Sequence, residues 1–154
     1  MNSKQLLDFV HSEPILKRFV KGVYASNTIP KVVMSYSSTF IINTQPLPLP
    51  GEHWVAVIMH SSAESDFFDS LGKPLGNYQS IGNFIYKNSE HCNVKCKRRQ
   101  PSYSNLCGLY VLVFVISRLC FKMSLSRIYA LFSSNIQYND DFVQSFIHEF
   151  CLNK

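Results

Sequence analysis

The chain has 154 residues, of which 46% are hydrophobic, and carries a formal net charge of +5. This length suits a single domain over residues 1–154, which would bury about two-thirds of its unfolded surface and leave little room for a second domain. The longest apolar run, residues 109–116, is well short of the ~20 residues that a membrane span requires, so we expect no membrane partner. The five cysteines are an odd number and no secretory signal is evident, which argues against a secreted disulfide framework. We expect an intracellular protein that is a monomer.

Helices are expected at the start of the chain and strands soon after them. A short amphipathic helix is predicted over residues 4–10, and a second helix begins at Ser12, continues through Pro14 and ends near Lys21. The prolines of segment 45–51 predict a loop. Runs of β-forming and apolar residues around and beyond this loop predict three strands, over residues 39–43, 53–59 and 66–71.

The second half of the chain is expected to be mainly helical. A helix is predicted over residues 80–86 and an exposed edge strand over residues 93–99. A buried helix follows around the apolar run, and two more helices are predicted over residues 125–132 and 140–151. Helices, then strands, then helices is the order of an α+β domain, with a mostly antiparallel central β-sheet flanked by helices.

Cys107 lies where polar, turn-forming residues give way abruptly to the apolar run 109–116. A Ser or Asn just ahead of such a run is a helix start signal, which places Cys107 in the first turn of the predicted buried helix. The helix dipole favours the thiolate there. A lone cysteine in this position is most often an unreactive core residue, so its companions decide the interpretation.

Three other residues have the side chains that a cysteine hydrolase needs. His53 begins the predicted strand 53–59 and is the candidate base, because none of the other four histidines has an acid motif at a matching place. Asp69, on the next predicted strand, is placed to orient the imidazole, whereas Asp66 is expected to be solvated. Gln100 precedes Cys107 by seven residues, close enough to join the Cys107 backbone N–H in an oxyanion hole. The order of these residues predicts a cysteine hydrolase with the nucleophile at the start of a buried helix.

Three segments resemble the His, Asp and Gln…Cys-Gly motifs of the adenovirus maturation protease (adenain) family and its relatives, the SUMO proteases. They are GEHW (51–54), FDSLG (68–72), and QP separated by five residues from CG (100–108). The spacing from Gln100 to Cys107 is similar to that of the adenoviral branch. The resemblance implies an α+β thiol endopeptidase that cleaves near glycines. In it Cys107 would be the nucleophile, His53 the base and then the acid, Asp69 the orienting residue and Gln100 an oxyanion donor.

The resemblance also implies partners. The adenoviral enzyme is activated by a peptide linked through a cysteine and by DNA, and Cys92 lies where that family has its linking cysteine. The substrates implied are viral capsid or core precursors, cleaved during virion maturation in the host nucleus or cytoplasm and in the virion. The chemistry itself needs no cofactor.

A basic cluster and a group of possible metal ligands lie close to Cys92. The cluster is a candidate DNA contact, although a solvated basic strand is the simpler interpretation, and it consists of Lys95, Lys97, Arg98 and Arg99. His91, Cys92 and Cys96 lack a fourth ligand at a usual spacing, so we expect no metal site.

Other functions remain open at this point. A deconjugating protease for a ubiquitin-like modifier has the same catalytic group, but it needs a broad docking surface for which this chain has little to spare. Acetyltransferases with the same His, acid and Cys order would transfer an acyl group instead of hydrolysing a peptide. An inactive module that binds nucleic acid through the basic cluster is the remaining alternative.

Overall fold

A computed structural model describes residues 1–153. Its centre is a five-stranded sheet whose spatial order is the same as the order of its strands in the chain. The central pairs β2–β3 and β3–β4 are antiparallel, and the two edge pairs, β1–β2 and β4–β5, are parallel. The strands are β1 (Val20–Ala25), β2 (Ser38–Asn43), β3 (Trp54–Met59), β4 (Glu64–Phe68) and β5 (His91–Val94). The predicted α+β class, with a central sheet flanked by helices, is confirmed; the sheet is mixed, antiparallel at its centre and parallel at both edges.

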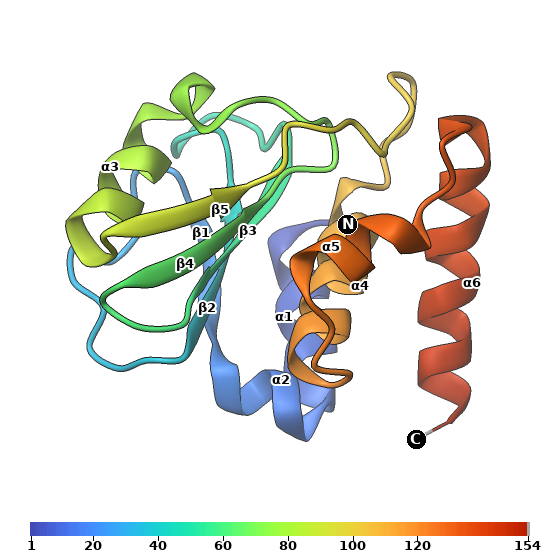
Figure 1. Ribbon diagram of the computed structural model, residues 1–154, viewed down its shortest axis with the longest axis horizontal. Helices are drawn as coiled ribbons and strands as arrows, with labels where there is room; N and C mark the ends of the chain where they lie inside the picture. The colour runs from blue at the N-terminus through green and yellow to red at the C-terminus, as the bar shows by residue number, and fades with distance from the viewer. Residues whose placement is uncertain (154) are drawn as a thin grey trace.

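Helices cover both faces of the sheet (Figure 1). One face carries α3 (Gln79–Asn88), and the other carries α1 (Ser3–Ser12), α2 (Pro14–Phe19), α4 (Cys107–Leu119) and α5 (Leu125–Leu131). The last helix, α6 (Asn139–Leu152), packs outside α4. Two short 3₁₀ helices, Leu75–Asn77 and Ile136–Tyr138, lie in the connections. Within residues 1–153, no helix is both long and apolar enough to cross a membrane.

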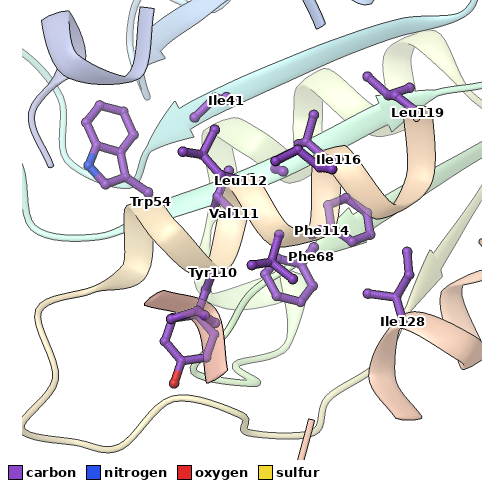
Figure 2. Close-up of a cluster of buried hydrophobic side chains, with 14 of the residues drawn as sticks. Ile41, Trp54, Phe68, Tyr110, Val111, Leu112, Phe114, Ile116, Leu119 and Ile128 are labelled. Atoms are coloured by element: carbon purple, nitrogen blue, oxygen red, sulfur yellow. The ribbon is translucent and has the colours of Figure 1, made fainter. Parts of the chain in front are cut away.

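Strand β3 is apolar along its whole length because both of its faces are covered. Alternate residues Trp54, Ala56 and Ile58 pack in the core beneath α4. The residues between them pack in the separate core beneath α3. Figure 2 shows how side chains from α4 fill the space above Ile41 and Phe68 of the sheet. The helix is buried from Tyr110 to Ser117, which explains the long apolar run in the sequence.

The residue limits of several predicted helices and strands were wrong. The second helix ends at Phe19 and not near Lys21, because Val20–Ala25 pairs in parallel with β2 and forms a strand that local pattern did not reveal. Strand β4 ends at Phe68, so Asp69 lies in the turn that follows and not within a strand. Strand β5 covers only His91–Val94, and the basic residues after it have irregular backbone. Helix α4 has Leu106 at its N-cap, without the Ser or Asn cap that the sequence suggested.

Gly72 offers a test of the turn that follows β4. Its φ is +68°, and a Cβ there would lie 2.4 Å from the backbone nitrogen of Arg98. Because neither the positive φ nor a backbone clash is relieved by rotating a side chain, we expect Gly72→Ala to lower the free energy of unfolding by about 2 kcal/mol or more. Urea titration measures this. Gly76→Ala is the control, since a Cβ at Gly76 meets nothing within 4 Å, and equal losses in the two variants would contradict the expectation.

Candidate active site

His53, Asp69 and Cys107 meet at one end of the sheet. His53 immediately precedes β3, and Asp69 immediately follows β4. Because β3 and β4 are antiparallel neighbours, the start of one lies beside the end of the other, and α4 begins at the same end with Cys107. Nε2 of His53 lies 2.6 Å from Oδ1 of Asp69, and the His53 side chain also hydrogen-bonds Cys107. All three are buried, with exposed fractions of 5%, 2% and 8%.

The Asp69 carboxylate is held by donors from the segment that follows it. Oδ1 accepts from the backbone N–H of Leu71 at 2.8 Å, in addition to His53. Oδ2 accepts from the backbone N–H of Lys73 at 3.2 Å and from the Tyr78 hydroxyl at 2.8 Å. Burial alone would raise the pKa of Asp69, but the hydrogen bonds from His53, Tyr78 and Leu71 outweigh it and the pKa is lowered. Asp69 is therefore an ionised acceptor that fixes the imidazole ring.

The environment favours a charged pair of His53 and Cys107. Burial lowers the pKa of His53, but hydrogen bonds and charge from Asp69 and Cys107 outweigh burial and raise the pKa to about 9. Burial raises the pKa of the Cys107 thiol, yet the hydrogen bond from His53 and those from the backbone N–H groups of Trp54 and Gly108 bring it below its ordinary value. Both shifts favour a thiolate beside an imidazolium, the activated form of a cysteine nucleophile.

Gln100 lies in the same cavity as Cys107. The cavity has a volume of about 440 Å³, and its lining includes Glu52, His53, Asn105 and both of these residues. The amide of Gln100 is held at both ends: Oε1 accepts from the Ser70 hydroxyl at 2.6 Å, and Nε2 donates to the Ser104 carbonyl at 2.9 Å. That second bond uses one of the two N–H groups on Nε2, which leaves the other as a donor for an oxyanion. The sequence indicated Gln100 itself, but not the two serines that hold it.

Met1 lies beside the candidate nucleophile, against Trp54 and Gly108. Its carbonyl accepts a hydrogen bond from Nε1 of Trp54 at 3.0 Å. Its side chain lies against Gly108, where an added Cβ would come within 3.0 Å of the Met1 Cβ. Met1 therefore forms one wall of the cavity, which no local motif indicated.

Neither Cys92 nor any residue of the basic cluster lines this cavity. Cys92 is buried on β5, and burial raises the pKa of its thiol, whereas Cys96 is exposed. A disulfide from Cys92 to another peptide therefore requires that this strand residue first become accessible. Lys95, Lys97 and Arg98 are exposed, but Arg99 is buried, with its guanidinium 5.6 Å from the centre of the Tyr129 ring. The expectation of four surface cations is therefore wrong for Arg99.

Asp66 was expected to be solvated, and the structure contradicts this. The residue is fully buried, and its Oδ2 accepts from Nε of Arg118 at 2.8 Å and lies 2.8 Å from Nε2 of His60. His60 thus has an acidic partner that the sequence did not indicate. Arg118 is 52 residues away on α4, so no local pattern pointed to the pair. Within residues 1–153, no group of three or more His, Cys, Asp or Glu side chains is arranged to hold a metal ion.

Comparisons with known proteins give weak similarity. No protein-family model matches the sequence, and no curated protein does. Among solved structures, the chain is similar to the crystal structure of the selenomethionine ASFV pS273R protease, with 22% identity and a TM-score of 0.39. The match covers 66% of this chain and 42% of that one, so the chain spans less than half the length of that structure. Similarity at this level does not place the chain in a family.

The charged pair predicts an unusually reactive thiol. At about pH 6, where ordinary thiols are protonated, Cys107 should be alkylated by iodoacetamide at least about tenfold faster than Cys151 because its pKa is lowered. Peptide mapping by mass spectrometry at several times measures both rates in one sample. His53→Ala should abolish the difference, and His60→Ala, which alters the other His–Asp pair, should leave it intact. Equal rates for Cys107 and Cys151 in the unmodified chain would refute the charged pair.

Proposed function

We propose that the protein is a cysteine endopeptidase. The observation that supports this best is the buried His53–Asp69–Cys107 arrangement, in which the pKa of the thiol is lowered and that of the imidazole is raised. An amide donor, Gln100, lies in the same cavity. An activated nucleophile, an acid–base group with its orienting carboxylate, and an oxyanion donor are the set that acyl transfer needs.

The chemistry follows from the positions of these groups. The Cys107 thiolate attacks the carbonyl carbon of the scissile bond, and the oxyanion that forms accepts hydrogen bonds from Gln100 and from the Cys107 N–H, which the helix's own ladder does not use. The His53 imidazolium then protonates the leaving amine, and the C–N bond breaks to give an S-acyl enzyme. Neutral His53 next takes a proton from water, which attacks the thioester and releases the acid. The thiolate and the imidazolium are restored.

The shape of the site favours a peptide over a small acyl donor. A second cavity of about 330 Å³ adjoins the first and shares with it Met1, Asn43, Gly51 and Trp54. It extends the site toward Tyr24, Leu47 and Leu49, which offer apolar contact for side chains beyond the scissile bond. Together with the resemblance of the three catalytic motifs, this supports cleavage at glycine-containing sites in capsid or core precursor proteins of a virus or virus-like element. The deconjugation of a ubiquitin-like modifier is the second candidate, because it needs the same catalytic groups.

Cleavage of a peptide library tests the function directly. We expect cuts next to glycine in internal sequences, and replacement of Cys107 by alanine should abolish them while circular dichroism remains unchanged. Cys151→Ala is the matched control and should cut like the unmodified chain, because Cys151 is exposed on α6. Cleavage only after a C-terminal Gly-Gly of a folded modifier would favour the deconjugase. Acetylation of library peptides from acetyl coenzyme A without hydrolysis would overturn the peptidase proposal.

The pH dependence of kcat/KM should be bell-shaped with a wide plateau. Its upper limb should fall near pH 9, where His53 loses the proton that the leaving amine requires. Its lower limb should lie below the ordinary titration range of a thiol, because the pKa of Cys107 is lowered and the thiolate persists as the pH falls. Steady-state rates on one peptide across this range provide the measurement. A rate that still rises above pH 9 would mean that His53 is not the acid.

A further inference from the structure

The Gln100 side chain can stabilise an oxyanion only when an N–H of its amide group points toward it. The Ser104 carbonyl can only accept, so the end of the amide that contacts it is Nε2, and Oε1 accepts from the Ser70 hydroxyl on the other side. The two N–H groups on Nε2 diverge at a fixed angle, so the bond to the Ser104 carbonyl sets the direction of the remaining N–H. The position of Ser104 therefore determines where the oxyanion donor points.

Ser104 is held in turn by Asp140, near the start of α6. The Ser104 hydroxyl donates to Oδ1 of Asp140 at 2.8 Å and accepts from the backbone N–H of Leu106 at 3.2 Å. The same Asp140 oxygen accepts from the Tyr110 hydroxyl at 2.8 Å. Tyr110 is fully buried on α4, three residues after the nucleophile. One carboxylate oxygen thus joins the loop that orients Gln100 to the helix that carries Cys107.

A second residue at the start of α6 holds the other side of Gln100. Asn139 is fully buried, and its Nδ2 donates to the carbonyl of Arg99 at 2.8 Å. Two adjacent residues of α6 therefore hold the chain on both sides of Gln100. Asn139 holds it at Arg99, immediately before Gln100, and Asp140 holds it at Ser104, four residues after. Neither Asn139 nor Asp140 lines the cavity of Cys107, so both act at a distance from the substrate.

We propose that Asp140 is a positioning residue that aims the Gln100 amide at the oxyanion; this inference rests on the peptidase function proposed above. Asp140 acts through Ser104 and does not contact substrate. Because Gln100 acts on the transition state and not on the bound peptide, the effect of Asp140 falls on kcat and leaves KM nearly unchanged.

The first test compares three variants in peptide cleavage. Asp140→Ala should lower kcat about 10- to 100-fold and change KM by less than about twofold. An oxyanion donor that points in the wrong direction stabilises the transition state little more than an absent donor does. Asp140→Asn keeps an oxygen that accepts both hydrogen bonds and should recover most of kcat. Asp141→Ala removes a neighbouring, exposed carboxylate from the same helix turn and should behave like the unmodified chain. An equal loss in Asp140→Ala and Asp141→Ala would overturn the proposal.

The second test asks whether Asp140 acts through Gln100. In a Gln100→Ala background, the further change Asp140→Ala should lower kcat by less than about twofold, because the amide to be positioned is already gone. Additive losses would overturn the proposal. If Asp140→Ala fails to fold, Ser104→Ala breaks the same link while retaining the Ser104 carbonyl, and the same pattern is expected.

Alkylation distinguishes positioning from general damage. The reaction of Cys107 with iodoacetamide forms no oxyanion, so Asp140→Ala should leave its rate at about pH 6 unchanged while kcat falls. A parallel fall in alkylation would overturn the proposal, since Asp140 would then support the whole site. Failure of the peptidase function itself would be visible separately, as absence of cleavage by the unmodified chain.

Discussion

The buried charge of Asp69 determines how the other groups of the proposed active site are arranged. A carboxylate in this position would take up a proton unless enough donors surround it. Four donors do so: the His53 ring and three groups from the segment 71–78. Because Nε2 of His53 is committed to Asp69, the other ring nitrogen is the one that remains for Cys107. The charge on the thiol and the orientation of the imidazole therefore both depend on the folding of a short turn after β4.

Large buried aromatic side chains lie next to each of the proposed catalytic residues and anchor the backbone there. Trp54 follows His53, Phe68 precedes Asp69, and Tyr110 lies one helical turn after Cys107. Phe68 stacks on Phe114 of α4, with ring centres 4.7 Å apart and planes inclined by 5°. The core beneath α4 thus fixes the backbone at three points around the site, which the polar side chains alone would not do. Short side chains on such rigid supports are held closely enough for acid–base chemistry.

The sequence identified those candidate residues that stand at a boundary between a polar and an apolar segment. His53 and Cys107 stand where polar segments meet apolar ones, so a sheet edge and a helix start could be predicted for them. Features that depend on distant partners were missed. Strand β1 becomes a strand only by pairing with β2, and the burial of Asp66 depends on Arg118, which comes much later in the chain. For Asp140 the sequence predicted only a place at the start of the last helix, because its partners Ser104 and Tyr110 lie 36 and 30 residues before it.

The turn after β4 also bears on how the protein would lose function on heating. Apart from His53, the donors to Asp69 come from Leu71, Lys73 and Tyr78, and Lys73 is exposed, in a connection without a strand or long helix of its own. Such connections open in local fluctuations that require far less free energy than unfolding of the core. Each opening would strip hydrogen bonds from the carboxylate and release the imidazole while the sheet and α4 stay folded. Inactivation and loss of secondary structure would then be separate events, with the first governed by the loop and the second by the core.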